Sequence, residues 1–348
     1  MAVVAQAIRV HGCRCPWTAA LQVDTLDIPQ STQPAAVRLT SEKGDDGAPL
    51  ERLIIDWDCA VPLHGGEHVQ RSEYSLEWLR AHSYSAADRA TRLQARPQPV
   101  LWTQMAGQPS AEWLPRVDMA AVSSDPGLRA AMSALRDYGA VIINGMPTSV
   151  VETQGVCERI GHLQRTFYAD GMWDTAPKAA EDINDTAYSN MELKPHTDCT
   201  YLSKAPGLQF FNCVAQSSSG GMTWIVDGFS VAAAMKASHP RTFQFFCNVP
   251  MTFYAKEDDV HVQATAYVFE TDYEGHITGF RFNNDDRAAM SSLTEGQVAA
   301  FYEEHLPVLL EMSRSPEVAE ELQLQVGDML ILDNNRHDPP AIVQCRLR

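Results

Sequence analysis

The pattern of apolar and polar positions predicts a mainly β chain with flanking helices. Short apolar runs closed by Gly, Pro or Asp are typical of strands. They predict strands at 53–57, 140–143, 207–214, 222–227, 243–254, 264–271, 278–282 and 329–332. Helical periodicity instead favours helices at 126–137, 149–163, 229–238 and 294–314. Many short strands with few helices between them indicate a sandwich or barrel rather than a doubly wound sheet.

Changes in composition along the chain predict two domains. Residues 20–84 read as short β segments, with a turn at Gly65-Gly66. Residues 85–115 are rich in Ala, Arg, Pro and Gln, and their prolines interrupt regular structure. We therefore expect a small β-rich N-terminal domain over 1–90, a linker over 91–118 and a larger domain over 119–348.

Charge and composition exclude several classes of protein. The chain has 348 residues, 45% of them hydrophobic, which is enough to bury a sizeable core. Its 27 Lys and Arg against 44 Asp and Glu give a net charge of −17, which argues against nucleic-acid binding. No window resembles a membrane span of roughly 18 to 20 apolar residues. Eight cysteines in a chain of this length do not indicate a disulfide framework, so a reducing compartment is expected.

The first residues leave the compartment open. Residues 1–23 contain Arg9 and Arg14, and no acidic residue precedes Asp24. Such a start can be read as an organelle transit peptide, although it contains little Ser. The sequence is therefore compatible with a cytoplasmic or a mitochondrial matrix location.

The sharpest chemical feature is His196-Thr197-Asp198. In an extended segment, residues two apart point to the same face, so this imidazole and this carboxylate would converge. They would supply two of the three ligands in the two-histidine, one-carboxylate triad of non-haem Fe(II) oxygenases. Taken alone, His-x-Asp also occurs by chance in many proteins.

Several blocks in a fixed order strengthen the metal interpretation. They are Asp185–Tyr188, His196–Tyr201, Pro206–Gln209, Gly220-Gly221, Val226–Phe229, Phe282–Ala288 and Leu332–Arg336. Together they resemble the 2-oxoglutarate- and Fe(II)-dependent dioxygenases of the taurine-dioxygenase superfamily. Within it, the chain resembles the trimethyllysine and γ-butyrobetaine dioxygenases of carnitine biosynthesis, and the trimethyllysine branch more closely.

This resemblance implies a fold, a reaction and partners. The expected fold is a double-stranded β-helix (jelly-roll). The reaction couples conversion of 2-oxoglutarate and O2 into succinate and CO2 to hydroxylation of a C–H bond, with ascorbate as an accessory reductant and a homodimer as the assembly. His196 and Asp198 would be iron ligands, and Thr223 would bind the distal carboxylate of 2-oxoglutarate.

The resemblance also implies a quaternary-ammonium pocket. Tyr168, Trp173 and Tyr188 match the family's aromatic cage, and Asn283 and Asn284 match further contacts. An Asp at position 185 favours a substrate with an α-ammonium group, as in N6,N6,N6-trimethyllysine hydroxylated at C3. Two alternatives are γ-butyrobetaine hydroxylation and a catalytically impaired relative that acts as a binding or partner protein.

A first departure from the family pattern concerns zinc. Relatives carry a structural zinc site with Cys-x-Cys-x-x-Cys and a later His. Here Cys13, Cys15 and His68 match, but Thr18 stands at the third cysteine. Since structural zinc needs four ligands, this region is a degenerate zinc site unless His11 or His64 substitutes.

A second departure lies after Arg336. The family's third iron ligand is a His three residues after this Arg, whereas His337 follows it directly. A shift of two residues along a strand moves a ligand by about 6–7 Å, and Pro339-Pro340 would disrupt a strand. Arg346 lies nine residues after His337, near the spacing of the second 2-oxoglutarate contact. We therefore expect a truncated or altered C-terminus and weakened iron binding, with His337 as the candidate third ligand.

Overall fold

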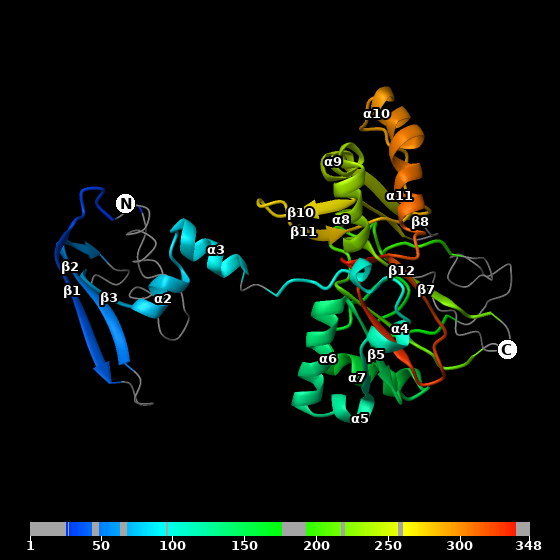
Figure 1. Ribbon diagram of the computed structural model, residues 1–348, viewed down its shortest axis with the longest axis horizontal. Helices are drawn as coiled ribbons and strands as arrows, with labels where there is room; N and C mark the ends of the chain where they lie inside the picture. Colours follow the sequence, from blue (N-terminus) through cyan, green and yellow to red (C-terminus); the bar gives the residue numbers. More distant parts are fainter. Residues whose placement is uncertain are drawn as a thin grey trace. The chain divides into compact units, whose positions relative to one another are not determined.

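The structure is a computed structural model that describes residues 26, 28–43, 49–62, 68–94, 97–175, 193–216, 220–256 and 260–338. The chain divides into two compact units, Met1–Pro97 and Gln98–Arg348 (Figure 1). Among the described residues, no helix is long and apolar enough to cross a membrane.

The first unit contains the predicted N-terminal β sheet. Three antiparallel strands follow one another in the order β1 (Pro34–Lys43), β2 (Pro49–Pro62) and β3 (His68–Ser75). Trp57 on β2 is buried, and its indole Nε1 donates a hydrogen bond of 2.9 Å to Ser72 Oγ on β3. In the described part of this unit, the sheet is followed by the helices α2 (Leu76–Ala81) and α3 (Ala86–Gln94).

The second unit has a mixed α/β fold. Its strands are β4 (Arg116–Asp118), β5 (Ala140–Asn144), β6 (Leu208–Asn212), β7 (Thr223–Asp227), β8 (Met251–Lys256), β9 (His261–Ala266), β10 (Phe269–Thr271), β11 (Ile277–Phe280), β12 (Ala319–Leu322), β13 (Met329–Asp333) and β14 (His337–Asp338). They form a four-stranded sheet β4-β5-β13-β6, a three-stranded sheet β12-β7-β14, and the hairpins β8-β9 and β10-β11. The prediction of a mainly β chain with flanking helices is thus confirmed only in part, because helices and strands are more evenly mixed in this unit.

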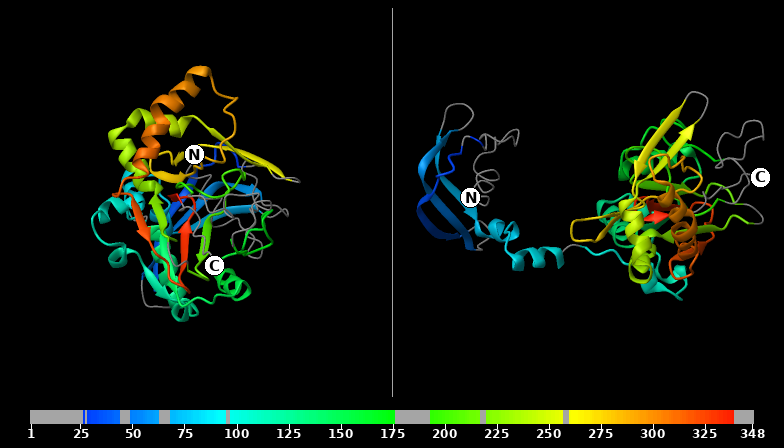
Figure 2. Two further views of the ribbon diagram at one scale, coloured as in Figure 1. Left: turned by 90° about the vertical axis from the view of Figure 1, so that its right-hand side faces the viewer. Right: turned by 90° about the horizontal axis from the view of Figure 1, so that it is seen from above.

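The helices of this unit lie in two groups. Those near the N-terminal half are η2 (Trp102–Met105), α4 (Ser110–Trp113), α5 (Met119–Val122), α6 (Asp125–Tyr138) and α7 (Val150–Ile160). Those later in the chain are α8 (Gly228–Ser238), α9 (Pro240–Asn248), α10 (Glu295–Ala300), the π-helical turn η5 (Phe301–His305) and α11 (Leu306–Met312). Figures 1 and 2 show α8 to α11 together at one end of the unit and α5 to α7 at the other.

Strand β13 lies at the centre of the larger sheet because its side chains are apolar on both faces. Met329, Leu330, Ile331 and Leu332 are fully buried. β13 pairs antiparallel with β5 on one side and with β6 on the other. A strand buried on both faces reads as a continuous apolar run, which is why the sequence identified this one. The end of β13 therefore has a fixed position next to β6.

One predicted strand is wrong. Residues 243–254 contain the helix α9 and only then the strand β8. Phe243 and Phe246, three residues apart, are both buried, as expected for one face of a helix, and Pro240 occupies the first helical turn. The aromatic residues that suggested a strand therefore pack with helical periodicity.

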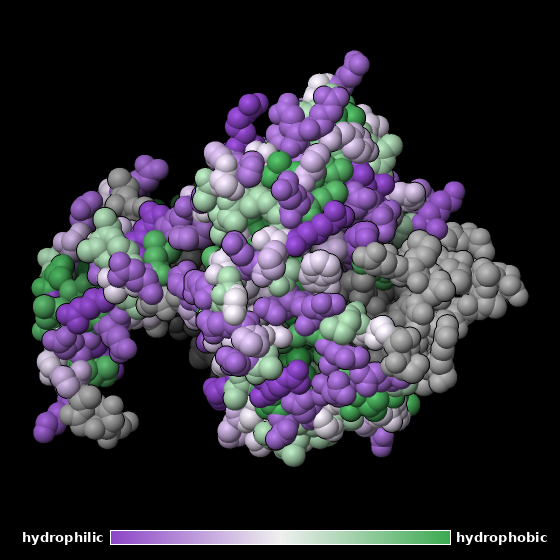
Figure 3. All heavy atoms as spheres, turned by 45° about the vertical axis from the view of Figure 1, so that its right-hand side comes forward, coloured by the Kyte–Doolittle hydropathy of each residue, from purple (hydrophilic) through white to green (hydrophobic). Residues whose placement is uncertain are grey.

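The stretch expected as a linker also contains packed structure. Between 98 and 118 lie η2, α4 and β4, and Trp102 and Trp113 are buried in one apolar cluster with Ile142 and Leu330. Trp102 and Trp113 meet edge to face with their ring centroids 4.9 Å apart. On the surface, Figure 3 shows hydrophobic residues scattered among hydrophilic ones on the face in view.

Candidate metal centre and substrate pocket

His196 and Asp198 converge, although the segment that carries them is not a strand. Residues 196 and 197 are irregular and residues 198–201 form a turn, with Cys199 at a positive φ of 55°. Thr197 between them anchors the segment: its N–H donates to the Phe282 carbonyl at 2.7 Å, and its Oγ1 accepts from Phe282 N–H at 2.9 Å. The predicted convergence is thus produced by a pinned loop rather than by strand geometry.

The orientation of His196 exposes one ring nitrogen as an acceptor. Its Nδ1 lies 2.7 Å from the Lys194 carbonyl oxygen, so Nδ1 must carry the proton and donate it. Its Nε2 then faces Asp198 Oδ1 at 3.0 Å. Two acceptors this close repel each other unless a proton or a metal ion lies between them. An imidazole nitrogen and a carboxylate oxygen are both ligands for non-haem iron, so this donor pair fits Fe(II).

Two amide side chains hold Asp198. The buried Asn334, just after β13, accepts from Asp198 N–H at 3.0 Å and donates to the Asp198 carbonyl at 3.1 Å. Its amide also donates to the Pro206 carbonyl at 2.9 Å. Gln209 on β6 donates from Nε2 to the carboxylate oxygen Oδ2. The backbone and the side chain of Asp198 are thus held separately.

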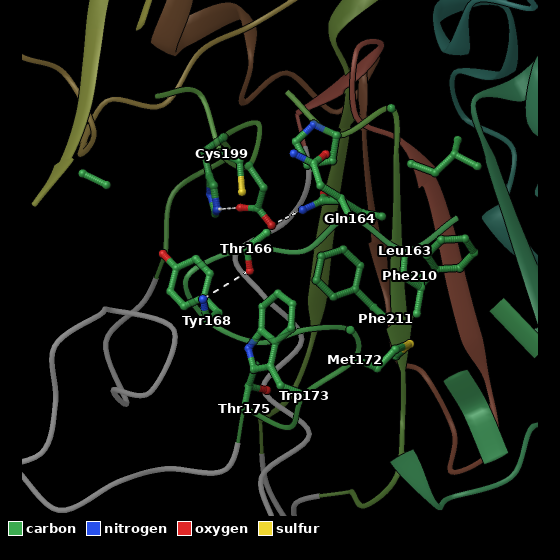
Figure 4. Close-up of a pocket in the computed structure, with 18 of the residues that line it drawn as sticks. Leu163, Gln164, Thr166, Tyr168, Met172, Trp173, Thr175, Cys199, Phe210 and Phe211 are labelled. Carbon is green, nitrogen blue, oxygen red and sulfur yellow. Dashed lines mark hydrogen bonds and ion pairs between the residues drawn. The ribbon is translucent and has the colours of Figure 1, made fainter. Parts of the chain in front are cut away.

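His196 and Asp198 line a cavity of about 720 Å³. Its wall is formed by the first turn of α7 and the loop that follows this helix, by β6, by the end of β8, and by Asn283, Asp285 and Asp286. Figure 4 shows part of this wall, including the loop residues Tyr168 and Trp173. The charged residues among the described lining are Asp174, Asp198, Asp285, Asp286 and Lys256, with His162 and His196 as imidazoles. Carboxylates therefore outnumber ammonium groups in this wall.

Aromatic side chains form one side of the cavity. Tyr168 and Trp173 lie on the same loop, and their rings stack with centroids 5.4 Å apart at 11° (Figure 4). The Tyr168 hydroxyl shares a hydrogen bond of 3.1 Å with the Tyr201 hydroxyl. Burial raises the pKa of the Tyr201 phenol, so this phenol stays neutral. Trp173 remains 41% exposed, so its ring is available to a ligand.

Of three further predicted site residues, Asn283, Asn284 and Thr223, only Asn283 lines the cavity. The Asn284 side chain accepts a hydrogen bond of 3.1 Å from Arg287. Thr223 is fully buried on β7, and its hydroxyl has no hydrogen-bond partner within the described ranges. Thr223 is not among the residues that line the cavity, so its role as a 2-oxoglutarate contact stays a prediction.

Five predicted residues fall outside the described residues: Cys13, Cys15, Asp185, Tyr188 and Arg346. His68 begins β3 and is exposed. The backbone of His337 lies in β14, paired with Asp227 of β7. The zinc set and the third iron ligand therefore stay predictions.

Sequence reasoning missed Gln209, Asn334 and Tyr201 as site residues. All three belong to the blocks that carry the family resemblance. Gln209 and Asn334 are amides, which do not indicate an iron ligand, and no local pattern distinguishes Tyr201 from an aromatic residue of the core. Asn334 meets Asp198 across 136 residues of sequence, so the contact depends on how β13 packs. A second group of three metal-ligand types, Asp272, Glu274 and His276, lies on the turn between β10 and β11. Its members hydrogen-bond one another there, with His276 Nδ1 3.1 Å from Asp272 Oδ2.

The imidazole of His196 and the carboxylate of Asp198 meet at the wall of a cavity, an arrangement compatible with an Fe(II)-dependent enzyme. The family model of taurine catabolism dioxygenase TauD, TfdA family matches residues 102–337, and the chain belongs to this family of Fe(II)- and 2-oxoglutarate-dependent dioxygenases. Within it, the chain belongs to the group of the γ-butyrobetaine and trimethyllysine dioxygenases.

The individual relatives do not separate these two activities. The chain is 30% identical over 311 residues to the γ-butyrobetaine dioxygenase of Pseudomonas sp. (strain AK-1), covering 89% of this chain and 74% of that one. It is also 30% identical over 310 residues to the trimethyllysine dioxygenase of Meyerozyma guilliermondii, covering 84% and 74%. A solved taurine dioxygenase from Burkholderia xenovorans aligns at 14% identity with a TM-score of 0.45, covering 62% and 75%.

Proposed function

We propose that this protein hydroxylates a trimethylammonium amino acid, and that the substrate is N6,N6,N6-trimethyllysine, oxidised at C3. The observation that carries the proposal is the stacked Tyr168–Trp173 pair in the same cavity as His196 and Asp198. A quaternary ammonium group cannot donate a strong hydrogen bond, so aromatic faces are its usual partners. Tyr188, which lies outside the described residues, would complete the cage.

The charges of the cavity wall favour trimethyllysine over γ-butyrobetaine. Trimethyllysine carries two cationic groups and one carboxylate, whereas γ-butyrobetaine carries one of each and is neutral overall. Asp174, Asp285 and Asp286 add negative charge to the wall, against the single ammonium of Lys256 among the described lining residues. The additional α-ammonium group gives trimethyllysine a favourable interaction with this wall that γ-butyrobetaine lacks.

The proposed metal ligands are His196 and Asp198, with His337 as the third. When bound, Fe(II) would supply the redox chemistry that couples 2-oxoglutarate and O2 to C–H hydroxylation. The residues of the chain contribute position: Lys194 and Gln209 fix the two ligand side chains, and Tyr168 and Trp173 hold the trimethylammonium end. Thr223 and Arg346 are the proposed contacts of 2-oxoglutarate, and the sheets around the pocket would form the double-stranded β-helix of the family.

Succinate release measured with each substrate tests this proposal. The protein is loaded with Fe(II) and 2-oxoglutarate under anaerobic conditions, and air is then admitted with trimethyllysine or γ-butyrobetaine. We expect trimethyllysine to give at least a tenfold higher kcat/KM. Faster turnover of γ-butyrobetaine would contradict the substrate assignment, and turnover of neither would favour the impaired, substrate-binding alternative.

A charge-matched pair of variants sharpens the assignment. Asp285→Asn removes one carboxylate from the cavity wall, and Asp272→Asn makes the same change at the turn between β10 and β11. Asp285→Asn should raise KM for trimethyllysine and leave KM for γ-butyrobetaine nearly unchanged, because only the first has an α-ammonium group. Asp272→Asn should change neither. An equal change for both substrates would show that Asp285 does not distinguish them.

A further inference from the structure

We infer that Gln209 is a positioning residue that determines which oxygen of Asp198 faces the metal. The inference rests on the metal centre proposed above and goes beyond its ligands. Gln209 Nε2 donates to Asp198 Oδ2, while Asp198 Oδ1 faces His196 Nε2 at 3.0 Å. The two carboxylate oxygens therefore have different neighbours, and only Oδ1 is directed toward the imidazole.

The amide orientation of Gln209 supports this role. With Nε2 toward the carboxylate, the amide oxygen Oε1 is buried and has no hydrogen-bond partner in the described part of the chain. The reverse orientation would place Oε1 against a carboxylate oxygen, and the two acceptors would repel. Buried polar atoms without a partner are uncommon in folded proteins, because each lowers stability. Gln209 thus keeps an unsatisfied acceptor in order to donate to Asp198.

Asn334 also contacts Asp198, but its side-chain amide bonds only to main-chain groups. Both ends of its side chain bond to main-chain groups, namely Asp198 N–H and the carbonyls of Asp198 and Pro206. Asn334 therefore sets the path of the loop, and Gln209 sets the rotation of the carboxylate. A partner of this kind orients a metal ligand, and its loss typically weakens metal affinity 10–100-fold.

Mn(II) affinity, measured by the EPR signal of free Mn(II), tests the inference without turnover. Gln209→Met keeps the length of the side chain but removes the donor, and Gln263→Met makes the same change at an exposed position on β9. We expect Gln209→Met to bind Mn(II) about 10–100-fold more weakly than the wild type. Its urea midpoint should equal or exceed that of the wild type, because the unsatisfied Oε1 is removed. Gln263→Met should change neither quantity.

Gln209→Asn provides a second variant that keeps the amide group. Its side chain is one methylene shorter, which draws the donor back from Asp198 Oδ2, so Mn(II) affinity should fall, by no more than in Gln209→Met, while the fold keeps a polar group at this position. Wild-type affinity in both variants would overturn the role of Gln209 and leave the metal centre intact. A wild-type chain that binds no Mn(II) would overturn the metal centre, and this inference with it.

Discussion

Asp198 and Asp227 are both aspartates of the second unit, but they differ in burial and in the groups that surround their carboxylates. Asp227 is fully buried and surrounded by donors: Trp102 N–H at 3.1 Å, Phe229 N–H at 3.1 Å, the Ser230 hydroxyl at 2.7 Å and Arg336 Nε at 3.3 Å. The side chain of Asp198 is 26% exposed to the cavity and faces an acceptor nitrogen of His196.

The difference separates a structural carboxylate from a proposed metal ligand. Asp227 has its cation in Arg336, whose guanidinium also donates 2.7 Å to the Asp137 carbonyl and to the Val100 carbonyl. The pair therefore ties together the start of the unit, α6, β7 and the segment after β13. Asp198 has no such built-in cation beside Oδ1 among the described residues, and a cation from solution can fill that place.

Asp198→Ala has the largest expected effect on function. It removes a proposed metal ligand, so succinate release with trimethyllysine should fall by more than about 100-fold, the upper limit for loss of an outer partner. The free energy of unfolding should hardly change, because relief of the repulsion between two facing acceptors offsets the loss of the hydrogen bond from Gln209. If Asp198→Ala keeps turnover and loses stability, then Asp198 is structural and the comparison with Asp227 fails.

Arg336→Met has the largest expected effect on stability. It leaves Asp227 as a buried charge without its cation, which costs about 3–5 kcal/mol. Urea unfolding monitored by tryptophan fluorescence measures this loss. Arg241→Met is the matched control, since the Arg241 side chain is 91% exposed and its contact with Glu304 is 3.9 Å. Equal midpoints for the two variants would show that the Asp227–Arg336 pair contributes little.

Trp173→Leu tests the aromatic wall beside Asp198 and has a smaller effect. A cation–π contact contributes about 0.5–2 kcal/mol, so KM for trimethyllysine should rise by roughly 2- to 30-fold. Trp173→Phe keeps an aromatic face and should show a smaller increase. If Leu and Phe raise KM equally, the ring contributes packing rather than recognition of the quaternary ammonium.

Asp333 provides the smallest and most specific effect, a pH dependence. This residue ends β13, and its burial raises the pKa of its carboxyl although Asn335 and Arg336 oppose the shift. The folded chain then keeps the proton to higher pH than the unfolded chain does. Stability from this group is therefore present at low pH and is lost as pH rises through the raised pKa.

Asp333→Asn should remove that decline. Urea unfolding of the wild type and of this variant between about pH 4 and 7 measures the difference between their free energies of unfolding. The difference should favour the wild type most at the acidic end of the range. A constant difference across the range would show that Asp333 titrates alike in the folded and unfolded chains.

Part of the fold was predictable because local patterns determine it. The apolar run of β13, the helix α6 and the N-terminal sheet all followed from sequence. The segment 240–248 did not, because its aromatic residues satisfy a strand propensity while burying one helical face. Trp102 and Trp113 were also missed, since proline content masked a packed segment.

The candidate metal ligands were predictable from sequence, whereas the residues that orient them were not. His196 and Asp198 were found by spacing, although a loop pinned to Phe282, and not a strand, brings them together. Gln209 and Asn334 reach Asp198 only because β6 and β13 are neighbours, and no local pattern encodes that pairing. The zinc ligands, the homodimer and His337 as third ligand stay predictions.

The central claim is that a divalent metal binds between His196 and Asp198. A Mn(II) titration of the wild type, Asp198→Ala and Asp272→Asn, followed by EPR of free Mn(II), tests it most directly. Asp272→Asn removes one of the two carboxylates of the alternative cluster on the turn between β10 and β11. We predict one saturable site in the wild type and in Asp272→Asn, and none in Asp198→Ala. A saturable site that survives in Asp198→Ala and disappears in Asp272→Asn would contradict the account.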